Sequence, residues 1–329
     1  MKRTSSKIAE KIWSKIVMLT ILLFVVFMVA ACAGINQGSA SKLADQGALV
    51  AKTVGQSYQS AGDDLARYVE AEYLLSGIKP GYSPPNDEML KSIDTIEKEL
   101  HLRQQMFAGL NDVYVSFGAL CTYDAKGEVE KSMGNTMQAA NNLATMLGGA
   151  VSASVGKLFA AVAGDVVGQV QSERIKNASA KIRSLLEGIV FLLEKQNEQA
   201  ALAGMRDEIA KEKLKVAKYF WENDFALADG ILDEEIQSYG LTPKAQALND
   251  ASKNPYLLKG VSAVLDWRYK KEVDSQVAAY NATIQSLRTL INEHSKIEAG
   301  EPVNLEAIQG YMLTIQQYVN LIAAVKKGK

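Results

Sequence analysis

The sequence predicts an all-α protein, an elongated antiparallel bundle of long helices with coiled-coil-like seams. Three observations lead to this prediction. The 329 residues include only six prolines and 7% aromatic side chains, a composition that disfavours a β-sandwich. Alanine, leucine, lysine, glutamate and glutamine, which favour helices, are abundant. From residue 43 onward, apolar residues recur at steps of three and four, and no convincing alternating strand pattern interrupts them.

The overall composition also limits the function. An apolar content of 48% is sufficient for a hydrophobic core, so the chain is not expected to be disordered as a whole. The formal net charge of -1 gives no electrostatic reason to expect a nucleic-acid partner, because such partners select a basic face. We therefore expect no nucleic-acid binding.

The amino-terminal 31 residues have the three parts of a secretory signal. The first part is cationic, with one acid, Glu10, among five basic residues: Lys2, Arg3, Lys7, Lys11 and Lys15. Residues 16–28 carry no charge, and Val29, Ala30 and Ala31 follow as the cleavage region. The apolar run over 16–28 is shorter than the ~20 residues that a membrane-spanning helix prefers, so a cleaved signal is favoured over an uncleaved anchor.

The segment Val29-Ala30-Ala31-Cys32 resembles the lipobox of bacterial lipoprotein precursors, a resemblance that covers residues 1–32 only. It implies transfer of a diacylglyceryl group to the Cys32 sulfur, cleavage after Ala31 and acylation of the new amino terminus. Two or three acyl chains make a durable membrane anchor, whereas one does not. Ala33 stands where inner-membrane lipoproteins tend to carry aspartate, which implies the outer membrane, on its periplasmic face or at the cell surface.

The mature chain is predicted to consist of a lipidated, flexible tether over 32–42 and a helical bundle over 43–329. The tether is expected because small and polar residues dominate this stretch. A first helix reaches about Ser76, with Leu43, Gly47 and Val50 starting its apolar stripe, and glycines and prolines between 77 and 85 end it.

The next helix has the clearest heptad pattern and begins at Asn86, a plausible N-cap. Arg103 is the single interruption of its apolar seam, which is predicted to pack against a neighbouring helix. The seam comprises Met89, Ile93, Ile96, Leu100, Phe107, Leu110, Tyr114, Phe117 and Cys121.

Further helices are predicted from about Lys126, over 175–236, through 273–294 and from a cap at Asn304 onward. Gly240, Thr242 and Pro243 form a stop-and-restart signal that could divide the bundle into two sub-bundles near residue 240.

Between residues 140 and 172 a small residue recurs at every fourth position. We call this series the small-residue ladder, with Gly148, Ser152, Gly156, Ala160, Gly164 and Gly168 as its central members. A groove of small side chains lets another backbone approach closely. One interpretation makes it the central buried helix of a bundle. The other makes it a segment that inserts in a membrane or oligomerises, which the charges of Lys157 and Asp165 disfavour.

The residues contain no pattern that predicts catalysis, a metal centre or a cofactor. His101 and His294 are too few for a multi-histidine site; His294 falls on an apolar seam and is expected to be a packed core residue, whereas His101 faces solvent. Cys121 is expected to be buried filler, because a reactive thiolate needs an accessible, electropositive setting. No phosphate-binding loop or nucleophile elbow is present.

The sequence therefore predicts a non-enzymatic, lipid-anchored scaffold or interaction protein exported to the outer membrane. Its expected partners are the membrane, through lipid on Cys32, and a protein partner or a second copy of the chain. The alternative is a membrane-active or pore-forming helical protein that uses the small-residue ladder.

Overall fold

The computed structural model describes residues 4–78, 81–195, 211, 214–216, 218–219, 237 and 255–326, with side chains from residue 37 onward. The predicted sub-bundle break near residue 240 lies outside these residues, as does most of the segment 196–254. All statements below concern the described part of the chain.

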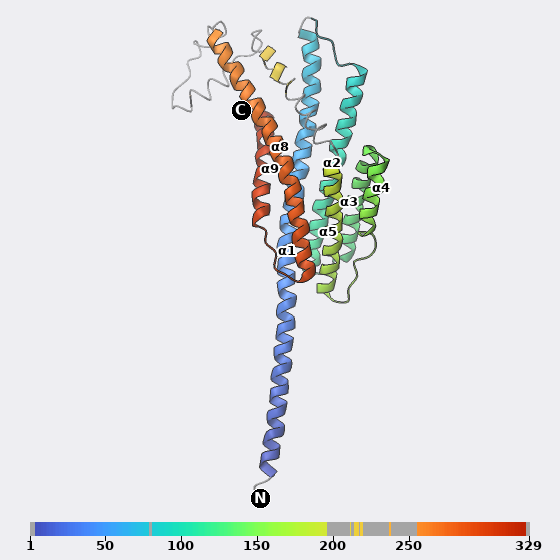
Figure 1. Ribbon diagram of the computed structural model, residues 1–329, viewed down its shortest axis with the longest axis vertical. Coiled ribbons are helices and arrows are strands. Elements are labelled where there is room, and N and C mark those ends of the chain that lie inside the picture. The colour runs from blue at the N-terminus through green and yellow to red at the C-terminus, as the bar shows by residue number, and fades with distance from the viewer. Residues whose placement is uncertain are drawn as a thin grey trace.

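The described chain is a bundle of long helices that pack antiparallel, and it contains no strand, which confirms the predicted fold class. Figure 1 shows the helices side by side along one axis. They are α1 (Thr4–Ile78), α2 (Asp87–Leu120), α3 (Lys126–Leu147), α4 (Gly149–Ala160), α5 (Gln171–Lys195), α8 (Pro255–Ala299) and α9 (Glu306–Lys326).

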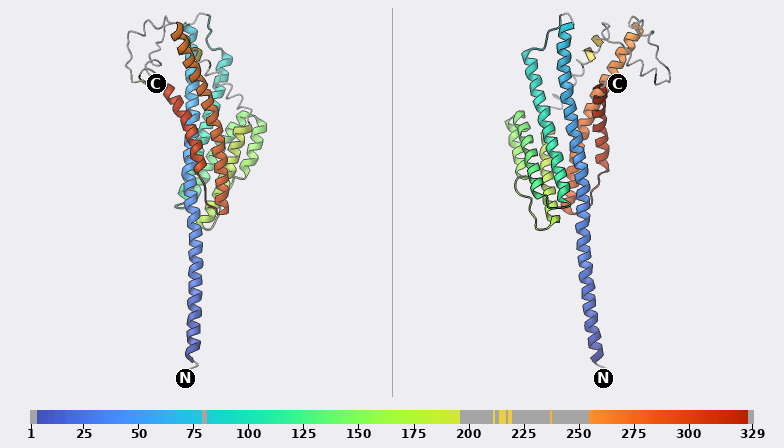
Figure 2. Two further views of the ribbon diagram at one scale, coloured as in Figure 1. Left: turned by 60° about the vertical axis from the view of Figure 1, so that its left-hand side comes forward. Right: turned by 180° about the vertical axis from the view of Figure 1, so that it is seen from behind.

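Helix α1 is the axis of the molecule. Its second half packs against α2, and also against α5, α8 and α9. Its first half extends beyond all the other helices, as both views in Figure 2 show. The opposite end of the bundle lies near Ile78, where the chain turns back into α2.

The flexible tether predicted over 32–42 is wrong, because these residues lie within α1. The small polar residues of this stretch have weak intrinsic helix preference. Packing overrides that preference: Ala40 and Leu43 are fully buried in the core. A rigid helix therefore leads from position 32 into the bundle.

The predicted starts of α2, α3 and α9 are confirmed, whereas α5 and α8 begin before the predicted ranges, at Gln171 and Pro255. Asn86 caps α2 by accepting a hydrogen bond from the Met89 amide at 2.8 Å. Helix α3 begins at Lys126, as expected, and Asn304 accepts a hydrogen bond from the Glu306 amide at the start of α9.

The predicted seam of α2 forms the core along its carboxyl-terminal half, where Phe107, Leu110, Tyr114 and Phe117 are fully buried. Arg103, which interrupts the apolar pattern, is buried too. Its Nε and Nη2 atoms donate to Glu99 Oε1 at 2.9 and 2.6 Å, so the buried guanidinium has a charged partner on the same helix. The interruption is thus accommodated inside the core.

Candidate functional site

The predicted modification site lies in the projecting half of α1. Ala31 and Cys32 are helical, but their side chains lie outside the described residues, so cleavage and lipidation stay predictions. Among the residues whose side chains the structure describes, which begin at position 37, no helix is both long enough and apolar enough to cross a membrane.

The small-residue ladder is not one continuous helix, which corrects the sequence-based interpretation. Helix α3 ends at Leu147, and Gly148 has a backbone φ of 118° that separates it from α4. Helix α4 ends at Ala160, and Gly164 and Gly168 lie in the loop that follows, with φ of 95° and 150°. These angles are easily reached only by glycine, so three ladder glycines serve as turns.

The central members of the ladder also form no close helix-packing groove among the residues that the structure describes, although Ala140 and Ala144 on α3 are buried in the core. Gly156 and Ala160 are exposed, Ser152 is half-buried, and a β-carbon added at Gly156 would meet no atom within 4 Å. Neither the central buried helix nor a single inserting helix is therefore present; α4 buries only Val155 and Phe159. Periodicity indicated one face, but it could not show where the helix ends.

The closest helix contacts involve glycines outside the ladder. A β-carbon at Gly47 of α1 would come within 2.2 Å of the Tyr114 ring, and one at Gly188 of α5 within 2.3 Å of the Phe159 ring. Gly47 lies on the predicted apolar stripe of its helix, which was the available sequence signal. The small residues that matter for packing are thus those opposite large aromatic rings.

The loop 161–170 is the main irregular feature among the described residues, and Lys181 of α5 holds its first part. The buried Lys181 ammonium donates to the backbone carbonyls of Val162, Ala163 and Gly164 at 3.0 to 3.1 Å. Hydrogen bonds from a charged donor are stronger than neutral ones. The ammonium therefore stabilises the chain just after α4.

Carboxylate and amide side chains hold the second part of the same loop. Glu130 Oε1 accepts from the Val166 amide at 2.6 Å, Asn177 Oδ1 from the Val167 amide at 3.1 Å and Glu173 Oε2 from the Gln169 amide at 2.9 Å. These bonds come from α3 and α5, so the loop is anchored to two helices. Its irregular backbone is stabilised by specific side chains rather than left to solvent.

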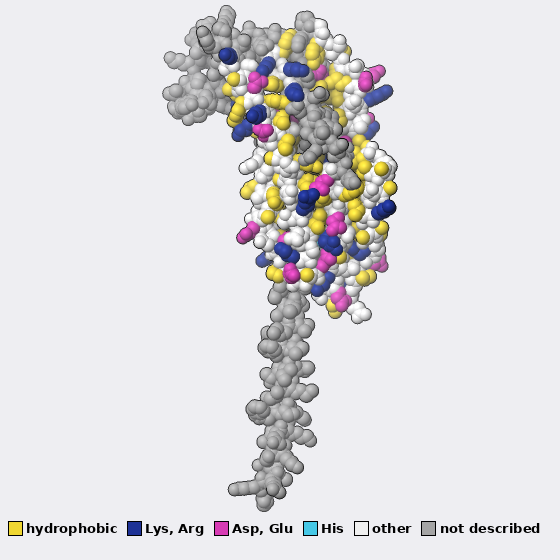
Figure 3. All heavy atoms as spheres, viewed as in Figure 1, with side chains coloured by type: hydrophobic (Ala, Val, Ile, Leu, Met, Phe, Trp, Pro, Cys, Tyr) yellow, Lys and Arg dark blue, Asp and Glu magenta, His cyan; other side chains and the backbone are white. Residues whose placement is uncertain are grey.

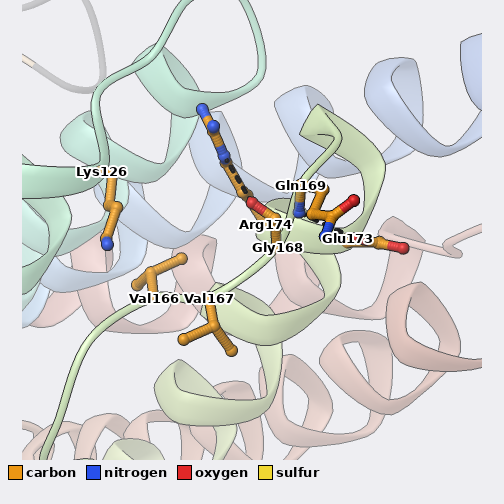
Figure 4. A pocket seen from close by; sticks show the side chains of 7 residues that line it. All are labelled: Lys126, Val166, Val167, Gly168, Gln169, Glu173 and Arg174. Atoms are coloured by element: carbon orange, nitrogen blue, oxygen red, sulfur yellow. Dashed lines mark hydrogen bonds between the residues drawn. The ribbon is translucent and has the colours of Figure 1, made fainter.

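A pocket of about 580 Å³ lies beside this loop (Figure 4). Arg174 donates to the Gly168 carbonyl at 3.1 Å and forms an ion pair with Asp124 at 2.8 Å. The basic side chains that line the pocket thus have acidic or carbonyl partners, with Lys126 3.8 Å from Glu130, and the lining contains no serine, threonine or cysteine. The lining residues are Lys126, Val166, Val167, Gly168, Gln169, Glu173 and Arg174.

A polar cluster lies in the core where α2, α5 and α8 meet. Tyr114 Oη is 3.1 Å from His294 Nε2, and Ser179 Oγ is 2.7 Å from His294 Nδ1 and 3.2 Å from the His294 carbonyl. All three residues are fully buried, which confirms that His294 is a packed core residue.

The cluster is consistent with a neutral imidazole. Burial, with a smaller effect from Arg183, lowers the pKa of His294 to about 3. A neutral ring that donates from Nδ1 to Ser179 can accept at Nε2 from Tyr114, whose own pKa burial raises. Ser179 can then donate to the His294 carbonyl, so every polar atom has a partner. The cluster is closed to solvent and links α2, α5 and α8 through hydrogen bonds in the core.

Cys121 is buried as predicted, and it is the one free cysteine among the residues with described side chains. Its thiol donates to the Phe117 carbonyl at 3.2 Å, and burial raises its pKa to about 12. Such a thiol is almost never ionised at neutral pH. The described residues also contain no cluster of three or more histidine, cysteine, aspartate or glutamate side chains able to hold a metal ion.

Comparison with known protein families, curated proteins and solved structures found no match to this chain.

Proposed function

We propose that this chain is a lipid-anchored helical scaffold or interaction protein of the bacterial outer membrane, with Cys32 as the lipidated residue and no catalytic activity. The observation that carries the proposal is the continuity of α1. One helix includes the lipobox-like segment and, eight residues later, Ala40 in the core. Lipid on Cys32 would thus be joined to the bundle by a stiff helix.

The arrangement of the bundle supports a scaffold. Its polar core groups, such as His294 and Ser179, are paired with each other and buried, so they stabilise helix packing instead of contacting a substrate. Its length is set by α1, α2 and α8, which run side by side. Such a rod presents long surfaces at a defined distance from a membrane.

The proposal is tested by metabolic labelling with a palmitate analogue in a bacterial host. The two cysteines of the chain provide a matched pair of variants. Label is expected in the wild-type chain and in Cys121→Ser, and it is expected to be lost in Cys32→Ser together with membrane association. Equal labelling of Cys32→Ser and wild type would refute lipidation at this position.

The membrane-active alternative is not favoured. It requires the small-residue ladder to form one long helix, whereas α4 has only 12 residues and is about 18 Å long. The hydrocarbon core of a bilayer is about 30 Å thick, so α4 alone does not span it.

A further inference from the structure

The end of the bundle from which the first half of α1 projects has a surface of its own. Three connections form it: 121–125 after α2, 161–170 after α4 and 300–305 after α8. We call this surface the proximal end. Figures 1 and 2 place these connections together at the base of the bundle, beside α1.

Side-chain contacts join the connections of the proximal end into one surface. Arg174 pairs with Asp124, and the Gln171 amide nitrogen donates to the Leu120 carbonyl at 2.9 Å, so the second connection is fastened to the first. Arg183 of α5 binds Glu298 near the end of α8 at 2.7 Å, which brings the third connection alongside.

The proximal end exposes large apolar side chains. Tyr123 is 58% exposed, Val167 60% and Val170 55%, and all three lie in its connections. The anchoring of loop 161–170 holds the two valines outward: the Val167 amide is bound to Asn177, and the neighbouring Val166 side chain is buried. A contiguous patch of exposed apolar side chains marks an interaction surface, whereas single exposed ones are ordinary, so what matters here is that these three lie on one end of the bundle.

Charges at the proximal end are mixed. Asp124 and Arg174 neutralise each other, Lys126 lies 3.8 Å from Glu130, and Asp165 and Glu301 add exposed acids. Figure 3 likewise shows basic and acidic side chains intermixed along the visible face of the bundle. This surface therefore lacks the basic cluster by which proteins bind anionic lipid headgroups.

The length of α1 limits how far the proximal end can lie from a membrane. Eight residues separate Cys32 from Ala40, the first core residue, which corresponds to about 12 Å of helix. The headgroup layer of one leaflet occupies about 5 to 8 Å of that distance. A lipid-bearing Cys32 would leave only a few ångströms between the bilayer surface and the connections.

We infer that the proximal end rests on the bilayer that holds the lipid anchor, with Tyr123, Val167 and Val170 inserted among the headgroups. This inference rests on the proposed anchoring through Cys32. Tyrosine suits this layer because its ring is apolar and its hydroxyl is polar. The contact is apolar in origin and is independent of anionic lipid. It sets the rod upright on the membrane.

The test uses the full, acylated chain in phosphatidylcholine vesicles, with Cys121→Ala as the background. A single cysteine is introduced at Val167 and labelled with an environment-sensitive fluorophore; acylated Cys32 has no free thiol. The control label is at Leu74, which is 53% exposed but lies about 50 Å along α1 from Ala40. Lipids that carry a quencher on the headgroup report contact, and aqueous iodide reports exposure.

The label at position 167 is expected to shift to shorter wavelength and to lose about half of its emission to the lipid quencher, whereas the label at 74 is quenched only by iodide. Anionic phosphatidylglycerol or high salt is expected to leave this difference unchanged. Equal iodide quenching at 167 and 74 would overturn the inference. A blue shift that requires anionic lipid would also overturn it. So would a label at 167 that is shielded from iodide but not quenched by the lipids, if this shielding disappears when each vesicle carries fewer protein molecules, because the label would then be covered by a second copy of the chain.

Failure of the anchor and failure of the contact are distinguishable in the same sample. Palmitate labelling and flotation with vesicles report the anchor. A chain that is acylated and floats, but has a water-exposed label at 167, retains the proposed function and loses only the membrane contact.

Discussion

The contact between Gly47 and Tyr114 makes a sharp prediction about stability. A β-carbon at Gly47 would lie 2.2 to 2.4 Å from three atoms of the Tyr114 ring. The ring cannot move aside easily, because it is fully buried and its hydroxyl is hydrogen-bonded to His294. Gly47→Ala therefore forces either a shift of α1 away from α2 or loss of the Tyr114–His294 hydrogen bond.

The magnitude follows from three effects. Alanine in place of a helix-interior glycine stabilises by nearly 1 kcal/mol. Overpacking of a filled core costs about 1 to 3 kcal/mol, and a buried polar group that loses its partner costs about 1 to 3 kcal/mol more. If both costs apply, the net result is a loss of about 1 to 5 kcal/mol in the free energy of unfolding.

Gly62→Ala is the matched control. Gly62 lies on the same helix, and a β-carbon there meets no atom within 4 Å, so only the helix preference changes. We expect this variant to be stabilised by up to about 1 kcal/mol. Urea unfolding of each purified variant, followed by far-ultraviolet circular dichroism, measures the difference. A Gly47→Ala protein as stable as Gly62→Ala would refute the packing argument.

Three further predictions concern the core, the loop after α4 and the small-residue ladder. Folding lowers the pKa of His294 to about 3, whereas its pKa in the unfolded chain is near 6.5. Because the unfolded chain takes up this proton more readily, the contribution of His294 to the free energy of unfolding is present above pH 6.5 and is lost as the pH falls toward 3. His294→Asn should therefore have a smaller loss of unfolding free energy between pH 7 and pH 4 than the wild type, and equal slopes would contradict the pKa assignment. Lys181→Met should speed amide hydrogen exchange in the loop that Lys181 holds, whereas Lys176→Met, half-buried on the same helix and not among the described donors to this loop, should not; parallel exchange rates in both variants would disprove this role. Gly156→Leu should leave the unfolding midpoint unchanged or raise it slightly, because the position is open and leucine favours a helix. Gly168→Leu should lower the midpoint, because a β-carbon there lies 2.8 Å from the Arg174 amide nitrogen; a similar midpoint for both variants would contradict this difference in packing.

Most helices could be predicted from the spacing of apolar residues alone. Steps of three and four between apolar residues require only local geometry, so they predicted the α2 seam. The caps at Asn86 and Asn304 were equally predictable, because a side chain there bonds to a backbone amide two or three residues away. The core position of His294 also followed from its place on a seam.

The ends of the helices around the ladder, and the glycines that pack against other helices, could not be predicted from the sequence, because both depend on long-range contacts. A glycine in a helical pattern is compatible with a helix interior or with a positive φ, so the sequence could not show that Gly148 and Gly164 are turns. The polar stretch before Leu43 is helical because Ala40 meets distant helices, and loop 161–170 is ordered by Lys181 and Glu130 from elsewhere in the chain. Contacts between segments distant in the sequence supply the free energy that overrides the weak helix preference of individual residues. The spacing of residues along the chain does not reveal these contacts.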